Sequence, residues 1–152
     1  MPTRYAHTNI ICEDWENLTD FFIKVFDCKP VPPKRNQSGE WLEKGTGVKN
    51  ASLKGMHLRL PGHGENGPTL EVYSYGEMIE KYGSPAANRK GFGHLAFEVD
   101  SVEETLKKMI SFGGSKLGEV VVKDVEGVGT ITFTYATDPE GNIIEIQSWK
   151  YI

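Results

Sequence analysis

The sequence contains few cysteines and no long apolar run. Only two cysteines, Cys12 and Cys28, occur among 152 residues, and they stand in no CxxC or other metal-ligand spacing. This argues against a disulfide scaffold and against a thiolate-bound structural zinc site. No apolar stretch approaches the ~18 residues that a membrane-spanning helix needs. We therefore expect a soluble protein of a reducing compartment that has no membrane partner.

Basic clusters and nucleotide-binding loops are also absent. The chain carries 17 Lys and Arg against 21 Asp and Glu, a net charge of -4, and its basic residues are spread along the chain. Nucleic acid is therefore not an expected partner. The glycine-rich stretches lack phosphate-loop spacing, and no Ser-His-Asp context is found. The N-terminus lacks the layout of a secretory signal, which predicts a cytoplasmic protein.

What the sequence does contain is an internal repeat. Residues 94–99 alternate apolar and polar side chains as a strand does, and residues 101–114 follow with helical spacing. The N-terminal segment YAHTNIICEDWENLTDFFIKVFDC shows the same pattern of strand and then helix. His7 and His94 occupy the same strand position in the two copies.

The later parts of the two copies correspond as well. Residues 56–75 and 131–149 each alternate, break at a turn-forming stretch, and alternate again, as hairpins do. Aligning the final strands places Glu71 opposite Glu145. Each copy is thus predicted to run strand, helix and then about three strands, beginning with a histidine and ending with a glutamate.

The repeat defines the expected domain organisation. We predict one α+β domain over residues 1–152, made of two tandem βαβββ modules at about residues 4–75 and about 91–149. Residues 76–90 form the linker, with room for a short helical turn. The first module is longer than the second, and its extra residues are expected within residues 32–67.

The alternation also predicts one polar side for each module. The histidines point away from the apolar strand residues that the following helix covers, and the late glutamates point to the same helix-free side. Two modules related by an approximate twofold axis could bring four such residues together: His7, Glu71, His94 and Glu145. Each residue alone would more often be an ordinary surface residue. Two imidazoles and two carboxylates at matched positions, however, suit a divalent metal ion.

On these segments the sequence resembles the vicinal oxygen chelate superfamily, which includes glyoxalase I, methylmalonyl-CoA epimerase, fosfomycin-resistance proteins, extradiol dioxygenases and bleomycin-binding proteins. The resemblance rests on HTNIICEDWENLTDFFIKVFDCKPV, LEVYSY, GFGHLAFEVDSVEETLKKMISFGG and TDPEGNIIEIQ, and it covers essentially the whole chain. It implies an open, barrel-like sheet around a metal cleft, commonly in a homodimer. It also implies metal ligands at His7, Glu71, His94 and Glu145.

Glutamate at position 71 favours the glyoxalase I-like members, because methylmalonyl-CoA epimerases usually have glutamine there and extradiol dioxygenases usually have histidine. The resemblance then implies a metal-dependent lyase or isomerase, similar to lactoylglutathione lyase, acting on a small molecule with adjacent oxygens. Proton transfer would pass through a metal-chelated enediolate, with Glu145 as ligand and principal base and Glu71 as ligand and second base. Mixed nitrogen and oxygen ligands leave Ni²⁺, Co²⁺, Zn²⁺, Mn²⁺ and Fe²⁺ open.

Three alternatives stay open on the sequence: a methylmalonyl-CoA-type epimerase, a small-molecule binding or resistance protein, and an extradiol-type dioxygenase. An epimerase would need a further acid, for which Glu40 and Glu43 are candidates, although solvated loop acids explain both better. Arg89 in the linker is expected in water, His57 on a strand surface and His63 in a loop. Four residues are expected to contact substrate: Asn9, Arg59, Tyr73 and Gln147.

Overall fold

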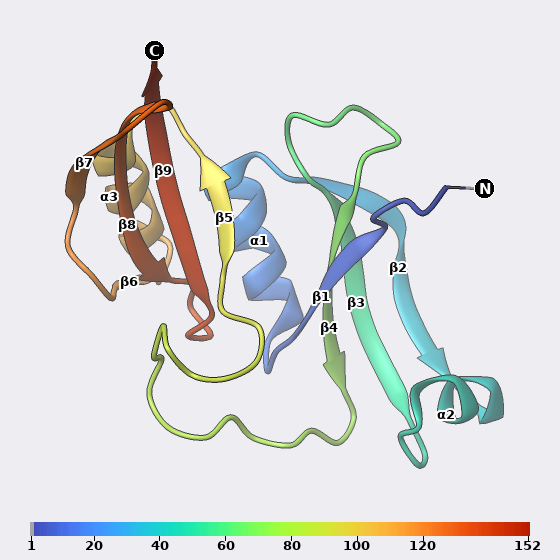
Figure 1. Cartoon of the computed structure of the whole chain (residues 1–152). Helices are drawn as coiled ribbons and strands as arrows, with labels where there is room; N and C mark the ends of the chain where they lie inside the picture. The colour runs from blue at the N-terminus through green and yellow to red at the C-terminus, as the bar shows by residue number, and fades with distance from the viewer. Residues whose placement is uncertain (1) are drawn as a thin grey trace. The chain divides into compact units, whose positions relative to one another are not determined.

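The computed structural model describes residues 2–152 and has an α+β fold with two open sheets of four and five strands (Figure 1). The chain divides into two compact units, Met1–Lys81 (unit 1) and Tyr82–Ile152 (unit 2). Each unit begins with a strand and a helix and continues with further strands. The predicted α+β fold built from two βαβββ repeats is thereby confirmed.

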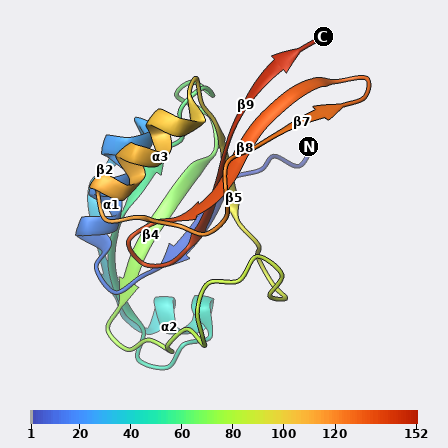
Figure 2. The ribbon, with the colours of Figure 1, turned by 90° about the vertical axis from the view of Figure 1, so that its left-hand side faces the viewer.

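Unit 1 builds its sheet in the strand order β1-β4-β3-β2. Its elements are β1 (His7–Ile11), α1 (Trp15–Phe26), β2 (Lys29–Ser38), α2 (Glu40–Thr46), β3 (Ser52–Arg59) and β4 (Thr69–Tyr75). β1 runs parallel to β4, whereas β3 is antiparallel to both of its neighbours. Helix α1 lies against β3 and β4 on one face of this sheet (Figure 2).

Helix α1 is specified locally at its start and by its packing along its length. The Asp14 side chain accepts a hydrogen bond from the backbone N–H of Asn17 at 3.0 Å, as an N-cap does. The buried residues of α1 recur at helical spacing and meet the apolar face of the sheet; the largest of these core residues are Leu18, Phe21, Phe22, Leu58, Leu70 and Val72. The opposite face of the sheet is therefore left for polar side chains.

Unit 2 has the strand order β5-β9-β8-β6, with β7 also paired to β8. Its elements are β5 (Leu95–Glu98), α3 (Val102–Ser111), β6 (Ser115–Lys116), β7 (Val121–Val125), β8 (Gly129–Thr137) and β9 (Ile143–Tyr151). Helix α3 begins after Ser101, whose hydroxyl accepts from the backbone N–H of Glu104 at 3.2 Å. The buried side of α3 packs against β8 and β9 (Figure 2).

Unit 1 has a helix that has no counterpart in unit 2, in the segment between β2 and β3. In unit 1 this segment contains α2, whose Leu42 packs with Ala51, Leu53 and Tyr73. Helix α2 therefore covers one end of the sheet face opposite α1 and buries the Tyr73 ring. Residues 76–94 contain no helix or strand, so the helical turn for which the linker had room is not formed. No helix within residues 2–152 is long and apolar enough to cross a membrane.

Candidate functional site

The candidate residues of unit 1 lie on the sheet face opposite α1, which we call the polar face. Strand register places its residues in three cross-strand rows: His7, Thr69, Arg59 and Lys29; then Asn9, Glu71, His57 and Val31; then Ile11, Tyr73, Gly55 and Arg35. Directly paired residues share a side of a sheet, as do alternate residues of one strand. Glu71 is therefore surrounded by polar neighbours in every direction.

Four side chains contact the carboxylate of Glu71. His7 Nε2 lies 3.1 Å from Oε1, and Asn9 Nδ2 donates to the same oxygen at 3.1 Å. The Tyr73 hydroxyl donates to Oε2 at 3.0 Å, and His57 Nε2 lies 3.0 Å from that oxygen. The Glu71 side chain is only 12% exposed, against 45% for His7. Because a carboxylate offers about four acceptor sites, this nearly buried charge is fully partnered.

His57 corrects the sequence prediction, which placed it on a strand surface. It is half-buried, and its Nε2 also contacts the Tyr73 hydroxyl. Burial lowers the pKa of His57 below its ordinary value, opposed by the charge of Glu71. Burial, followed by the charge of Glu71, raises the pKa of Tyr73. At neutral pH Tyr73 therefore keeps its proton and can donate it in a hydrogen bond to Glu71.

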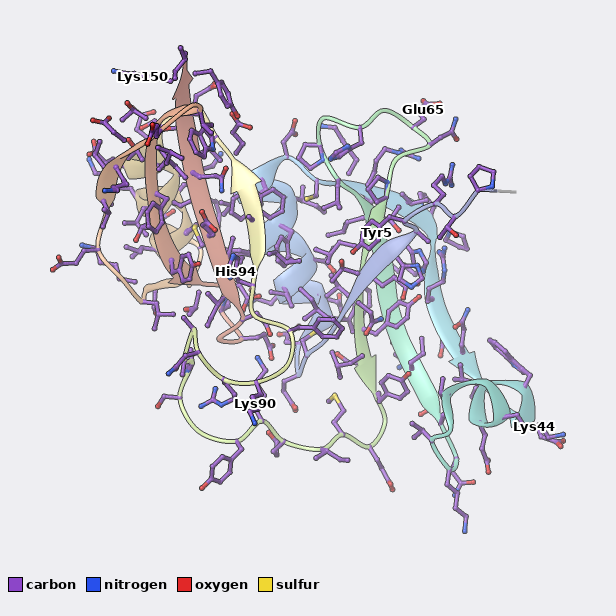
Figure 3. All side chains as sticks on the ribbon, in the orientation of Figure 1. Tyr5, Lys44, Glu65, Lys90, His94 and Lys150 are labelled. Carbon is purple, nitrogen blue, oxygen red and sulfur yellow. The ribbon has the colours of Figure 1, made fainter. Side chains whose placement is uncertain are left out.

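Unit 2 repeats the histidine–glutamate pair. His94, which stands just before β5 (Figure 3), has its Nε2 3.1 Å from Glu145 Oε1. Gln147 Nε2 donates to Glu145 Oε2 at 2.8 Å, and Trp149 Nε1 donates to Gln147 Oε1 at 2.7 Å. The Tyr135 ring lies beside the His94 ring, with their centroids 4.6 Å apart. Trp149 and Tyr135 were not among the predicted residues, since nothing in the repeat marks them.

The correspondence between the units therefore extends to a third residue. In each unit a first-strand histidine meets Oε1 of the last-strand glutamate, and the residue two positions after that glutamate donates to Oε2. The third residue is Tyr73 in unit 1 and Gln147 in unit 2. Both residues donate to a carboxylate in the structure, and their predicted contact with substrate stays a prediction.

Each pair fits one edge of a divalent metal centre. Adjacent ligands on an octahedral ion with bonds of ~2.1 Å are about 3.0 Å apart, and the Nε2–Oε1 distance is 3.1 Å in both pairs. Imidazole nitrogen and carboxylate oxygen are suitable donors for such ions. Across residues 2–152, no group of three or more His, Cys, Asp or Glu side chains is arranged to hold a metal ion. Each pair thus supplies two donors.

The remaining candidates lie away from Glu71 and Glu145. Arg59 belongs to the polar face, but its Nε donates to the backbone oxygen of Glu65 at 3.2 Å. Arg89 donates to the backbone oxygen of Ser84. Glu40 and Glu43 lie in helix α2 and not in a loop, which corrects the prediction. Glu40 pairs with a lysine one turn later, and Glu43 accepts a backbone N–H after the helix, so both have structural partners.

Two βαβββ repeats, each with a histidine–glutamate pair on its polar side, define a paired-module protein. The family model of the Glyoxalase/Bleomycin resistance protein/Dioxygenase superfamily matches residues 4–146, and the chain belongs to this superfamily. The resemblance found in the sequence is thereby confirmed.

Solved structures share this fold. A glyoxalase family protein from Bacillus cereus is 20% identical, with a TM-score of 0.82 over 98% of this chain and 95% of that one. An integron cassette protein from V. cholerae is 21% identical, with a TM-score of 0.55 over 99% and 98%. The fosfomycin resistance protein FosX from Listeria monocytogenes is 16% identical, with a TM-score of 0.57 over 99% and 96%. No curated protein matches the sequence.

Proposed function

We propose that this protein is a metal-dependent proton-transfer enzyme, a lyase or isomerase of the glyoxalase I type. One divalent ion would be held by four residues: His7, Glu71, His94 and Glu145. The observation that carries the proposal is the repetition of one contact, histidine Nε2 to glutamate Oε1 at 3.1 Å, in both units. Two ligands from each pair would leave positions on an octahedral ion for a substrate with adjacent oxygens.

The bound ion would act as a Lewis acid that polarises a substrate carbonyl and so acidifies the neighbouring C–H. Glu145 is the better candidate to take that proton. Among the residues that the structure describes, one side chain contacts each oxygen of Glu145, whereas two contact each oxygen of Glu71. Glu145 therefore retains acceptor positions that Glu71 has already filled.

The other residues of each cluster would orient the carboxylates. Gln147, itself held by Trp149, fixes Oε2 of Glu145, and Tyr73 with His57 does the same for Glu71. Returning the proton to the neighbouring carbon would give isomerisation. Returning it to the same carbon from the opposite side would give epimerisation, so the same residues could serve either outcome.

A solved structure of a FosX variant supports a metal and a small molecule in this fold. That protein, 16% identical to this chain with a TM-score of 0.52, is complexed with Mn(II) and 1S,2S-dihydroxypropylphosphonic acid. We extend to this chain only a divalent ion and a small-molecule substrate. The homodimer implied by the resemblance and the cytoplasmic location expected from the sequence both stay predictions.

Hydrogen exchange in D₂O tests the proposed function. Purified protein is loaded in turn with Ni²⁺, Co²⁺, Zn²⁺, Mn²⁺ or Fe²⁺. Each sample is mixed with the hemithioacetal of methylglyoxal and glutathione, or with methylmalonyl-CoA, and the C–H signals of the substrate are followed by proton NMR. We expect metal-dependent transfer or exchange of the acidic C–H proton with one substrate and none after EDTA treatment. Oxygen uptake with a catechol, or tight binding without turnover, would instead favour a dioxygenase or a binding protein.

Changing Tyr73 to Phe should weaken metal binding by about tenfold, because a hydrogen bond that orients a ligand carboxylate is lost. The ring would still pack against Leu42 and Leu53, so the fold should be unaffected. Titration against a metal-sensitive dye measures the affinity. Tyr75→Phe is the matched control, since Tyr75 packs against the same cluster. An equal loss in both variants, or a loss in neither, would contradict the role given to the Tyr73 hydroxyl.

A further inference from the structure

The polar face of unit 1 carries an excess of positive charge. Lys29, Arg35 and Arg59 share it with a single carboxylate, Glu71. Lys29 is paired with Asp27 at 2.9 Å, whereas both arginines donate to backbone oxygens and keep their charge uncompensated by those contacts. In a protein whose net charge is -4, this face is electrostatically unlike the average surface.

The equivalent face of unit 2 has a different character. Its polar and aromatic residues, as strand register places them, are Glu98, Lys123, Phe133, Tyr135, Glu145, Gln147, Trp149 and Tyr151, and Ala96, Val121 and Ile131 share the face. The only arginine of Tyr82–Ile152 is Arg89, which lies in the segment before β5 and donates to Ser84. The two faces thus share the histidine–glutamate pair but not the arginines, so the two arginines on the polar face of unit 1 are not explained by the repeat.

Arg35 is placed beside the Glu71 cluster by a register shift in β2 between Val31 and Arg35. The shift puts Arg35 opposite Gly55, which in turn is opposite Tyr73. Gly55 has no side chain, and a Cβ there would come within 2.5 Å of Tyr73 Cδ1. The Tyr73 ring therefore occupies the space over Gly55, next to Arg35.

The Arg35 guanidinium uses only one of its three nitrogen atoms as a donor to the described residues. Its Nη1 donates to the backbone oxygens of Val31 and Pro33, both within its own strand. A guanidinium has five N–H donors in a planar fork, and no contact of Nε or Nη2 with another described residue is seen. Such a fork matches the two oxygens of a carboxylate, phosphonate or phosphate group. The half-buried position of Arg35 would strengthen this attraction relative to a fully exposed cation.

We propose that Arg35, with Arg59 on the other side of the His57 row, binds an anionic group of the substrate, so that the substrates are small organic anions. The proposal rests on the proposed function, because it names the substrate class of that same site. The anionic group would lie over the polar face while the adjacent oxygens of the substrate are presented to the ion. A neutral substrate would leave both arginines, which lie in the rows on either side of the Glu71 row, without an anionic partner.

Anion binding by the full-length protein tests this proposal. Methylphosphonate and acetate are titrated calorimetrically into EDTA-treated and into metal-loaded protein, with methanol as the neutral probe. We expect both anions to bind without metal, Arg35→Gln to weaken binding about tenfold or more, and Arg35→Lys to restore part of it, because lysine keeps the charge and loses the fork. Arg59→Gln should have a smaller effect. Arg4→Gln and Arg89→Gln are the control variants, because neither residue belongs to a strand of the polar face.

Phenylglyoxal modification of the wild-type protein gives a second measurement that does not depend on the folding of a variant. The chain has four arginines, Arg4, Arg35, Arg59 and Arg89, so mass spectrometry can follow each one. Methylphosphonate should slow the modification of Arg35 and leave that of Arg4 and Arg89 unchanged.

Three results would overturn the proposal. The first is that methylphosphonate does not slow the phenylglyoxal modification of Arg35, and the second is that Arg35→Gln binds the anions as tightly as the wild type. The third is that the anions bind only to metal-loaded protein, with an affinity that substitution of Arg35 does not change. Wild-type protein that binds metal but no anion would refute this inference alone. Wild-type protein that binds the anions through Arg35 but takes up no metal would refute the proposed function and leave the anion site standing.

Discussion

Glu145→Gln is expected to abolish stoichiometric metal binding and to lower metal-dependent hydrogen exchange by about 10²–10⁴-fold. The amide keeps the size of the side chain and can still accept a hydrogen bond from His94. It lacks the negative charge that an ion requires of this position, and it cannot take a proton from carbon. Both proposed roles of Glu145 are therefore removed while its hydrogen bond with His94 can be kept.

Glu71→Gln separates the two roles. Because glutamine is usual at this position in methylmalonyl-CoA epimerases, we expect this variant to bind the metal more weakly than the wild type and not to lose it. At metal concentrations high enough to restore binding, Glu71→Gln should recover much of the exchange activity, whereas Glu145→Gln should not. Equal failure of both variants at saturating metal would contradict the assignment of Glu145 as the principal base.

Glu98→Gln is the control for loss of charge alone. Glu98 shares the sheet face of Glu145, is exposed, and accepts a hydrogen bond from the Tyr151 hydroxyl at 3.1 Å. Elemental analysis after dialysis should find metal in the wild type and in Glu98→Gln, less metal in Glu71→Gln, and none in Glu145→Gln. Circular dichroism checks that each variant is folded. Half of the metal remaining in each single variant would mean that each pair binds its own ion, and would contradict a shared centre.

Much of the fold could be predicted because its signals are local. Asp14 and Ser101 cap their helices as their sequence context indicates. Strand alternation put His7 with Glu71, and His94 with Glu145, on one side of each sheet, and the structure brings each pair to 3.1 Å. The role of these pairs as metal ligands stays a prediction, since proximity within a unit does not identify a bound ion.

The residues that sequence reasoning missed depend on register. His57 meets Glu71 only because β3 pairs with β4 in one particular alignment, and β3 follows an insertion that has no counterpart in unit 2. Arg35 lies opposite Gly55, one row from Glu71, because two extra residues of β2 stand between Val31 and Arg35; a shift of two residues keeps the side chain on the same face and changes only its row. Neither the insertion nor the shift leaves a periodic signal, so alternation alone could not place these residues.

The turn between β8 and β9 supports Glu145 through a buried carboxylate, that of Asp138, which is only 2% exposed. Its Oδ1 accepts from the backbone N–H groups of Glu140 and Asn142 at 2.8 and 3.0 Å, and its Oδ2 accepts from Asn142 Nδ2 at 2.8 Å. Asp138→Ala would leave these donors without their acceptor. We expect the free energy of unfolding to fall by about 3 kcal/mol, because a buried donor that loses its partner costs roughly 1–3 kcal/mol.

Urea unfolding followed by circular dichroism measures this loss. Asp124→Ala is the matched control: Asp124 accepts from the Thr130 hydroxyl at 2.8 Å, but that hydrogen bond is exposed, so its removal should cost less than about 1 kcal/mol. The loss of unfolding free energy in Asp138→Asn should lie between those of Asp138→Ala and Asp124→Ala, because the asparagine side-chain oxygen can still accept hydrogen bonds from the turn. If Asp138→Ala were no less stable than Asp124→Ala, the turn would be held by its backbone hydrogen bonds, and the Asp138 carboxylate would be dispensable for presenting the strand that carries Glu145.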